Sequence, residues 1–468
     1  MVVKGKIGAD QSYRAGSSRS GTKTNTPLED TPQSVTVITR ALVADQAMQN
    51  MADVVRYMPG VSMGQGEGHR DQPTIRGNSS TADFFVDGFR DDAQYFRDLY
   101  NAEQIESLRG SNAMIFGRGG AGGVINRVGK EAMWTSLRGS SLEGGSADHK
   151  RASIDFNQPW TDVAAGRFNA MYENSGAFRD RVRLRRFGIN PVIGLRPIAA
   201  LRVSAGYEHF DDRRTVDRGI PSFQGAPSAA GRRTFFGQPD SSYANTVVDA
   251  GSAYAEMRIG SAWTLRNRAR AAHYDKFYQN IFPGSLNASG TQVNISGYNN
   301  GTQRTNLINQ TEAVIGARAL GAWHTLLAGV EVGHQASDNL RNTGYFNGGT
   351  ATSINADFTQ PTLSIPVEFR QSATDADNHV VVKTGAIYLQ DQVALSPRVQ
   401  AILGLRAERF DIAVHNNRDG SDVSRVDEML SPRIGLVIKP VSPVSLYGSY
   451  SVSHLPSSGD QFSSLTAT

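Results

Sequence analysis

Beyond Lys130, apolar and polar residues alternate along the chain, and the alternation recurs in short blocks. The clearest blocks cover residues 152–156, 168–172, 201–207, 265–271 and 434–438. A period of two indicates β-strands with one apolar and one polar face. We recognise about 13 such candidate strands, and their length suits the ~9–11 residues that a tilted strand needs to cross a bilayer.

The connections between these strands alternate in length. Tight links are predicted at 195–199, 260–263, 320–322, 395–398 and 439–443. Long polar segments separate them, at 211–249, 276–308, 338–381 and 413–430. A membrane β-barrel has short turns on its periplasmic side and long loops outside, whereas a soluble sandwich has no reason to sort its loops by end. The second half of the chain is therefore predicted to be an antiparallel membrane β-barrel.

The first part of the chain has a different pattern. Residues 1–32 are polar and are expected to be a flexible leader. Residues 34–39 alternate like a strand, and Thr39 can cap a helical stretch that runs to Met58, before Pro59 and Gly60. Short β-rich bursts follow at 74–76, 84–87, 105–109 and 124–128, separated by Gly, Asn and Asp. Residues 33–129 thus form one small α/β domain, which needs a larger structure around it.

Composition narrows the function classes. The 468 residues include 48 basic and 44 acidic ones, so net charge does not indicate nucleic-acid binding. The chain has no cysteine, which excludes thiol catalysis, iron–sulfur clusters and cysteine-ligated zinc. The first 30 residues lack the apolar core of a signal peptide, and no stretch of about 18 apolar residues predicts a membrane-spanning helix.

Several segments together resemble TonB-dependent outer-membrane siderophore receptors. In the first domain these are IRG (75–77), FFVDGFRD (84–91), QYFRD (94–98), EQIESLRG (103–110) and IFGRGGAGGVIN (115–126). In the second half they are AIYLQDQ (386–392), GLR (404–406) and SPRIGL (431–436). The resemblance covers residues 24–462 and looks closest to receptors for ferric catecholates.

The resemblance implies a fold and an activity. The fold is an outer-membrane barrel of about 22 strands filled by an N-terminal plug, with the leader at 1–32, the plug at 33–129 and a partial barrel at 130–468. The implied activity is binding of a ferric siderophore and its import with energy from TonB, by a monomer in the outer membrane of a Gram-negative bacterium. Iron enters as the ligand, so no resident cofactor is expected. Haem, cobalamin and saccharides are alternative substrates for this scaffold.

The resemblance also places ligand-binding residues at the plug apex. Arginine beside aromatic rings suits an anionic, aromatic chelate, because it combines charge with stacking. The predicted residues are His69, Arg70, Gln94, Tyr95, Phe96 and Arg97. His69 is not expected to ligate iron, since the chelator fills the coordination sphere.

Two further contacts are implied by the resemblance. Arg76 and Arg109 are expected to form a latch with barrel carboxylates, since buried arginines need such partners. Because this chain has Val452 where relatives often carry glutamate, the predicted partners are Glu331, Glu408 and Asp411. Val2 and Val3 are the candidate TonB contact.

Other chemistries find little support in the sequence. The spacing of Gly117, Gly119 and Gly122 matches a dinucleotide fingerprint, but the residues that follow read as a strand and not as the required helix. The nine histidines show no paired spacing for a metal, and no serine lies in a nucleophile elbow. No catalytic residue, metal site or enzyme activity is therefore expected.

The end of the chain raises a competing hypothesis. An odd number of strands cannot close a bacterial antiparallel barrel, and the final residues do not form a strand ending in an aromatic residue. On this basis we expect an incomplete barrel in a truncated, transport-incompetent receptor. A β-rich surface or adhesion protein is the other alternative.

Overall fold

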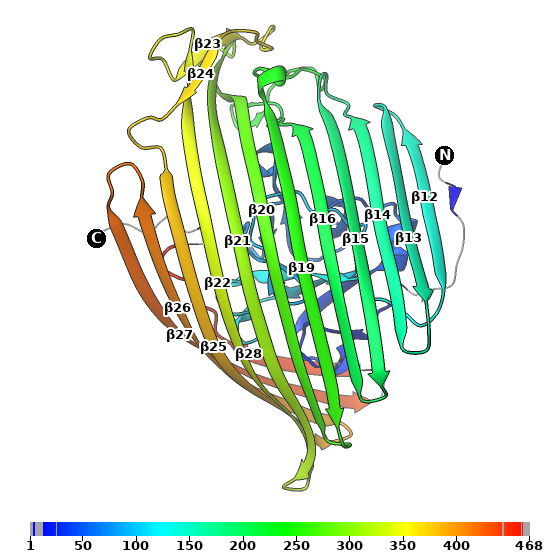
Figure 1. Cartoon of the computed structure of the whole chain (residues 1–468). Helices are drawn as coiled ribbons and strands as arrows, with labels where there is room; N and C mark the ends of the chain where they lie inside the picture. The colour runs from blue at the N-terminus through cyan, green and yellow to red at the C-terminus, as the bar shows by residue number, and fades with distance from the viewer. Residues whose placement is uncertain (1–2, 5–12, 25, 442–443, 460, 462–468) are drawn as a thin grey trace.

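The alternating blocks form one continuous antiparallel sheet that curves into an arc (Figure 1). The computed structural model describes residues 3–4, 13–24, 26–441, 444–459 and 461. Consecutive strands pair in sequence order throughout the arc. Its strands are β12 (Leu137–Gly145), β13 (His149–Pro159), β14 (Ala164–Gly176), β15 (Arg183–Ile198), β16 (Leu201–Thr215), β19 (Tyr243–Ile259), β20 (Trp263–Leu286), β21 (Gln292–Ala319), β22 (Ala322–Phe346), β25 (Asp377–Ser396), β26 (Val399–Asn416), β27 (Asp422–Val441) and β28 (Val444–Ser451).

Short strands join this sheet at its margins. β1 (Val3–Lys4) pairs with β12, while β23 (Ser353–Asp357) and β24 (Val367–Arg370) pair with the upper ends of β21 and β22. β17 (Ser222–Phe223) and β18 (Ala226–Pro227) form a separate hairpin in the long β16–β19 connection, which also contains η3 (Pro239–Ser241).

Alternation along each strand gives the arc an apolar outer face and a polar inner face. In β26, for example, Leu403 and Leu405 are exposed on the outside, whereas Arg406 and Glu408 are buried on the inside. Exposed leucines on a folded surface are stable where the surroundings are lipid. Among the described residues, no helix is long and apolar enough to cross a membrane.

Connection lengths also alternate as predicted. Tight turns join β15 to β16, β19 to β20, β21 to β22, β25 to β26 and β27 to β28. We call the end with these turns the short-turn end and the opposite one the long-loop end. The predicted long loops are too long, however, because β20, β21 and β22 run on for 24, 28 and 25 residues. The ends of these strands near the long loops carry polar residues on both faces, so the sequence shows no period of two there. Their backbones nevertheless continue the hydrogen-bonded ladder of the sheet.

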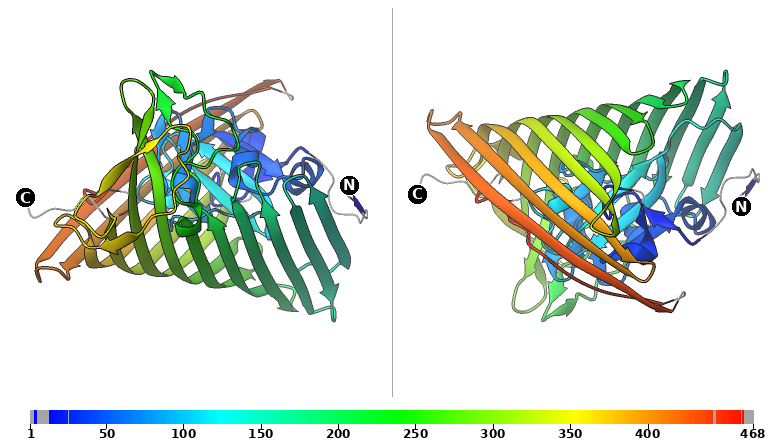
Figure 2. Two further views of the ribbon diagram at one scale, coloured as in Figure 1. Left: turned by 90° about the horizontal axis from the view of Figure 1, so that it is seen from above. Right: turned by 90° about the horizontal axis from the view of Figure 1, so that it is seen from below.

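The predicted α/β domain lies on the concave side of the arc, as Figure 2 shows from both ends. Its sheet has the order β4-β10-β11-β8-β9, formed by β4 (Ser34–Thr39), β10 (Ala102–Arg109), β11 (Gly123–Gly129), β8 (Phe84–Val86) and β9 (Phe89–Arg90). β5 (Val61–Met63), β6 (Pro73–Ile75) and β7 (Asn78–Ser79) form a smaller sheet beside it. The β-rich bursts of the sequence are thus confirmed, and we call this domain the plug.

The single helix predicted from Thr39 to Met58 is wrong. Two helices are present in that segment, α1 (Arg40–Asp45) and α2 (Met51–Val55), capped by Thr39 and Asn50. Ala47 lies between them with φ of 48°, a left-handed conformation that a continuous helix cannot contain. Buried residues of α2 join Ile38, Ile105 and Ile125 in the plug core. The plug also has α3 (Ala113–Phe116) and η2 (Gly66–Gly68).

The flexible leader expected for residues 1–32 is not what the structure shows for residues 13–24 and 26–32. This segment, which we call the strap, contains β2 (Ser17–Ser18), β3 (Thr26–Pro27) and η1 (Leu28–Asp30). Ser18 and Thr22 are fully buried. Gln390 of β25 donates a hydrogen bond to the Thr22 carbonyl at 2.8 Å, and Arg433 of β27 donates to the Gly21 carbonyl at 2.9 Å. The small polar residues of this segment predicted disorder in the sequence. In the structure, however, strands of the arc, which we call the wall, donate hydrogen bonds to its backbone carbonyls.

Candidate functional site

A cluster of arginine, tyrosine and carboxylate groups lies where the plug meets the wall at the long-loop end. Its plug residues come from the turn around η2, between β5 and β6. Gly68 has φ of 76°, and a Cβ there would be 2.5 Å from the carbonyl oxygen of Asp217, so glycine allows this turn to touch the β16–β19 connection. We call the group the apex cluster; it comprises Glu67, His69, Arg70, Arg218, Lys276, Tyr278, Phe282, Tyr298 and Arg341.

Glu67 is the electrostatic centre of the apex cluster. Its carboxylate is 3.1 Å from both Arg70 and Arg218, and it accepts a hydrogen bond from the Tyr298 hydroxyl. Burial would raise the pKa of Glu67, but the contact with His69 and the charge of Arg70 outweigh burial and hold that pKa below its usual value. Glu67 is therefore ionised at neutral pH and ties the plug to strand β21, through Tyr298, and to the β16–β19 connection, through Arg218.

Cationic groups of the cluster lie against aromatic rings. The Arg218 guanidinium is 3.7 Å from the centre of the Phe282 ring, and Arg341 is 3.8 Å from that of Tyr298. Arg218 also donates hydrogen bonds to the hydroxyls of Tyr278 and Tyr298, at 2.8 and 3.0 Å. This arrangement can hold a ligand that is both anionic and aromatic, because it offers charge and π faces together.

Two of the predicted apex residues belong to this cluster. The His69 ring packs on Tyr278, with ring centres 4.0 Å apart, and Arg70 pairs with Glu67. Burial and the nearby Lys276 charge lower the pKa of His69 well below its usual value, so the ring is neutral at physiological pH. The Lys276 side chain is buried, and no described residue forms an ion pair or hydrogen bond with its ammonium group.

Two other predicted residues lie nearby without joining the cluster. Gln94 is partly buried and donates a hydrogen bond to Thr81 at 3.1 Å. Phe96 is partly buried beneath Arg214 of β16, whose guanidinium is 4.1 Å from its ring centre. A ligand role for both residues stays a prediction.

Tyr95 and Arg97 lie in the plug interior instead of lining a ligand surface. Arg97 is fully buried, and its guanidinium donates to the Asp91 carboxylate at 2.8 Å and to the carbonyls of Asp91, Ala93 and Tyr95. Tyr95 is buried with its hydroxyl on Asp91. All three guanidinium nitrogens of Arg97 thus donate hydrogen bonds that brace the 91–98 loop. Arg97 was predicted to bind the ligand because the sequence does not show that the loop brings the Asp91 carboxylate back to its guanidinium.

The predicted latch is also different in the structure. Arg76 is exposed, and Arg109 donates its hydrogen bonds to the Pro59 carbonyl and the Ser34 hydroxyl, both within the plug. Glu331 and Glu408 pair with Arg406 of the wall itself, at 3.0 and 2.8 Å. No contact joins Asp411 to the plug among the described residues. Both glutamates thus share one basic partner within the wall, and in the described structure neither Arg76 nor Arg109 pairs with them.

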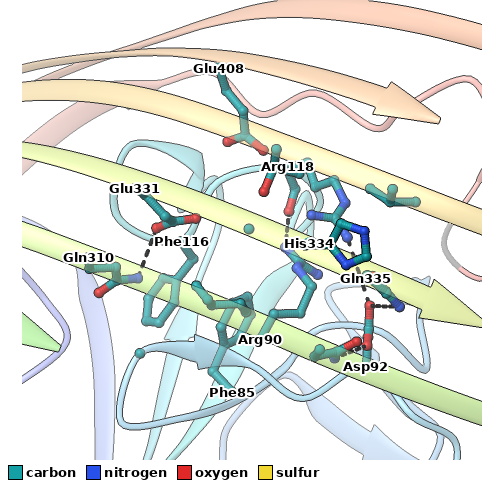
Figure 3. Close-up of a pocket in the computed structure, with 16 residues that line it drawn as sticks. Phe85, Arg90, Asp92, Phe116, Arg118, Gln310, Glu331, His334, Gln335 and Glu408 are labelled. Carbon is teal, nitrogen blue, oxygen red and sulfur yellow. Dashed lines mark hydrogen bonds and ion pairs between the residues drawn. The ribbon is translucent and has the colours of Figure 1, made fainter. Parts of the chain in front are cut away.

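Glu331 and Glu408 nevertheless line a narrow pocket between plug and wall (Figure 3). Plug residues on its other side are Phe85, Arg90, Asp92, Phe116 and Arg118. Burial and the neighbouring Arg90 lower the pKa of Arg118 to about 10. The pocket therefore brings together acidic wall groups and basic plug groups, as the latch hypothesis supposed, but through Arg118 and the 117–119 loop. A Cβ at Gly117 would be 2.6 Å from a Glu408 oxygen.

The ion pairs that do join plug to wall were missed. Asp98 of the plug receives Arg151 at 2.8 Å and Arg186 at 3.0 Å, and Asp92 receives Arg304 at 3.2 Å. Two other plug–wall pairs are Arg40 with Asp155 at 2.6 Å and Glu103 with Arg167 at 3.3 Å. Lys23 of the strap pairs with Glu312 at 3.0 Å, and Lys130, just after the plug, pairs with Asp155 at 3.0 Å. A signal was available: polar Arg151, Arg186 and Arg304 occupy inward positions of otherwise alternating strands.

Predicted contacts and absences complete the description. Val2 lies outside the described residues, while Val3 is in β1, paired with Leu142 of β12; a TonB contact at either residue stays a prediction. Across the described ranges, no group of three or more His, Asp or Glu side chains could hold a metal. After Gly122, β11 is a strand, which agrees with the rejection of a dinucleotide fingerprint.

Comparison with known families gives two matches. The TonB-dependent receptor plug domain matches residues 27–124, and the TonB-dependent receptor-like β-barrel matches residues 186–468.

Curated relatives are similar over most of the chain. PiuA of Acinetobacter baumannii, a probable TonB-dependent siderophore receptor, is 26% identical over 467 residues, covering 92% of this chain and 62% of PiuA. BfrD of Bordetella pertussis, a probable TonB-dependent receptor, is 28% identical, covering 98% and 65%. The catecholate siderophore receptor Fiu of Escherichia coli K12 is 26% identical, covering 94% and 64%. The chain thus spans 62–65% of the length of these relatives.

Solved structures share the fold. The crystal structure of PiuA from Acinetobacter baumannii superimposes with a TM-score of 0.90 at 23% identity, over 98% of this chain and 70% of that one. The closed form of Fiu from Escherichia coli gives 0.84 at 24%, over 96% and 69%. At these identities the likeness establishes the architecture, a plug inside a curved β-wall.

Proposed function

Because this chain belongs to the TonB-dependent receptor family, whose barrel matches more than half of its residues, we propose that it binds a ferric siderophore and imports it with energy from TonB. Proteins of this family are receptors and transporters, not enzymes. The apex cluster carries the proposal, since it places Arg218 and Arg341 on aromatic rings beside the plug. Such a surface suits a chelate that is anionic and aromatic at the metal.

The proposal fixes an orientation in the outer membrane of a Gram-negative bacterium. The long-loop end and the apex cluster face outward, and the short-turn end faces the periplasm, as in outer-membrane barrels. The exposed apolar side chains of the arc contact lipid. A plugged transporter of this kind has about 22 strands, and the long strands described here form an arc of such a wall. The protein acts as a monomer, and iron arrives as part of the ligand.

For the substrate we propose a ferric catecholate. Receptors named for catecholates are among the relatives, although another relative is named as a metal-pseudopaline receptor. Catechol rings can stack on Tyr298 and Phe282 while their oxygens meet guanidinium groups, which needs both components of the cluster.

The test measures binding of the radiolabelled iron complex of 2,3-dihydroxybenzoate to de-energised cells. Arg218→Gln is expected to weaken binding about tenfold, since it removes one charge-assisted hydrogen bond to the anionic chelate, worth ~1.5 kcal/mol. Arg233→Gln is the matched control, because Arg233 is an exposed long-loop arginine paired with Asp180 outside the cluster. Equal binding by both variants, or tighter binding of haemin or cobalamin than of the catecholate complex, would refute the assignment. Energised uptake should require TonB.

A further inference from the structure

A second cavity lies between plug and wall, toward the short-turn end. Its volume is about 470 Å³, and it is open to solvent on one side. The wall side is formed by β15, β16, β19 and β20, close to the tight turns at 198–201 and 259–263. The plug side is formed by the turn between β8 and β9, the end of β11 and the strap.

Basic side chains dominate the described lining of this cavity. Arg266, Arg268 and Arg270 occupy alternate positions of β20, so all three point to the inner face. We call them the arginine ladder. The other charged lining residues are Arg19, Lys23, Lys130, Arg202, Asp87, Glu131, Glu208 and Glu256. Seven basic groups thus face four acidic ones.

Several donors of the arginine ladder lack acceptors among the described residues. Arg270 is 7% exposed, yet its Nε and Nη2 have no hydrogen-bond partner among the described residues. Its nearest carboxylate is Glu208 at 4.0 Å, whose other oxygen accepts from Asn101. The Nε atoms of Arg266 and Arg268 also lack partners, although both arginines pair with Glu312, at 2.9 and 3.3 Å. Buried guanidinium donors without acceptors are costly, so their presence calls for an explanation.

The cavity adjoins the pocket of Figure 3. Gly88 and Phe116 line both spaces, so the β8–β9 turn and α3 separate them. Arg268 donates a hydrogen bond to the Asp87 carbonyl of that same turn, at 3.1 Å. A residue of the ladder therefore holds the part of the plug that divides the two spaces. A shift of this turn would join the pocket to the cavity along β20 to β22.

We propose that the arginine ladder is an anion-receiving subsite on the periplasmic side of the plug. It receives the oxyanion groups of the ferric chelate after the chelate has left the apex cluster. These oxyanions supply the acceptors that the guanidinium donors lack, in bidentate geometry. This inference rests on the proposed function for the identity of the ligand. The affinity of the cavity for anions does not depend on that identity, so the two can be tested separately.

The first experiment measures the charge preference of the cavity. Because the chain has no cysteine, Ser204→Cys places a unique thiol in the lining. Outer membranes carrying the full chain are treated with anionic and cationic methanethiosulfonates, and the ratio of the two rates cancels differences in access. We expect the anionic reagent to react about tenfold faster. In Arg268→Gln/Arg270→Gln this ratio should fall toward one.

Matched variants keep this experiment decisive. Arg318→Gln removes an exposed arginine at the same end of the neighbouring strand β21 and should leave the ratio unchanged. Arg270→Lys should retain the ratio, since it keeps the charge. Glu208→Gln should raise it, which provides a test should the double variant fail to reach the membrane. A ratio near one in the parent protein, or the same ratio in every variant, would overturn the subsite.

The second experiment measures transport of the iron complex of 2,3-dihydroxybenzoate. The double variant should bind it on de-energised cells within about twofold of the parent, while energised uptake falls about tenfold. Unchanged uptake would show that the chelate does not use the ladder. Absence of binding by the parent would instead refute the proposed function, and the thiol ratios would still decide whether the cavity receives anions.

Discussion

Replacing Asp98 by asparagine is expected to loosen the plug from the wall. Arg151 grips the Asp98 carboxylate with two hydrogen bonds of 2.9 and 2.8 Å, and Arg186 lies 3.0 Å from it. Burial would raise the pKa of Asp98, but Arg151 and Arg186 lower it to about 2. The carboxylate is therefore charged in the folded protein at neutral pH, and asparagine removes that charge with little change of shape.

The free-energy cost of Asp98→Asn depends on the carboxylate that still contacts Arg151 and Arg186. Glu173 still contacts both arginines, at 2.9 and 2.5 Å, so two buried guanidinium groups share one carboxylate after the substitution. Removing one member of a buried ion pair costs about 3–5 kcal/mol, and Glu173 places this case at the lower end. Because ~1.4 kcal/mol corresponds to a factor of ten, about 3 kcal/mol should raise the population with a displaced plug about 100-fold.

Thiol labelling can report this population. Ala272 of β20 is 3% exposed and packs in a cluster with the plug residues Ala93, Tyr95 and Tyr100. The thiol introduced by Ala272→Cys is therefore reachable only when the plug moves away, and the natural chain has no cysteine that would compete for the label. When closing is faster than labelling, the labelling rate follows the opening equilibrium.

The control for Asp98→Asn is Asp148→Asn, made in the same Ala272→Cys background. Asp148 forms an exposed pair with Lys150 in the β13 hairpin, and such pairs contribute at most ~1 kcal/mol. The control should raise the rate of labelling at position 272 less than about fivefold. Equal labelling rates for the two variants would show that the ion pair does not hold the plug.

Three further predictions test other parts of the structure. Burial raises the pKa of Asp71 to about 6, although Arg97 acts in the opposite direction. The protonated carboxyl therefore stabilises the fold below pH ~3.8, and this stabilisation is lost as the pH rises through 6. Asp71→Asn should thus raise the melting temperature at pH 7.5 but not at pH 4. Gly122→Ala should destabilise the plug by at least ~2 kcal/mol in chemical denaturation, because the new Cβ would lie 2.2 Å from the Ile75 carbonyl oxygen, whereas Gly251→Ala meets open space. Gln390→Leu leaves the buried Thr22 carbonyl without its donor, a loss of ~1–3 kcal/mol that should speed hydrogen exchange in the strap; Gln279→Leu, which removes a similar bond to the Ser241 carbonyl, should not.

Features that depend on local pattern could be predicted from the sequence. A period of two marks the wall strands whichever partner each one finds, and Gly, Asn and Asp mark the turns. Thr39, the predicted cap, does cap α1 through a contact three residues away, whereas the Asn50 cap of α2 was missed. The family segments are equally local. The fold class and the plug were therefore within reach, while the left-handed Ala47 was not, since alanine adopts that conformation only under tertiary constraint.

Charge pairing across the plug–wall interface depends instead on distant residues. Asp98 and Arg186 are far apart in sequence, and Lys23 pairs with Glu312, which lies 289 residues further along the chain. A buried arginine is expected to pair with a carboxylate, but a sequence motif does not indicate which one. The partner depends on strand register, which brings distant carboxylates close to the arginine. Arg97 illustrates the difficulty, since its partner Asp91 lies six residues away within its own loop. The predicted latch pairs of Arg76 and Arg109 are absent from the described structure for this reason, and Arg97 pairs within the plug.

The charges at the plug–wall interface bear on how a plug can be both secure and movable. Buried ion pairs add little net stability compared with apolar packing, although breaking a single pair is costly. Asp92, Asp98 and Glu103 of the plug pair with wall arginines, so displacement exposes groups that water solvates well. An interface of apolar side chains would resist the same displacement through the whole area that it exposes. On the proposed function, then, ion pairs fix the register of the closed plug, while the arginines freed on opening are left facing the anionic cargo.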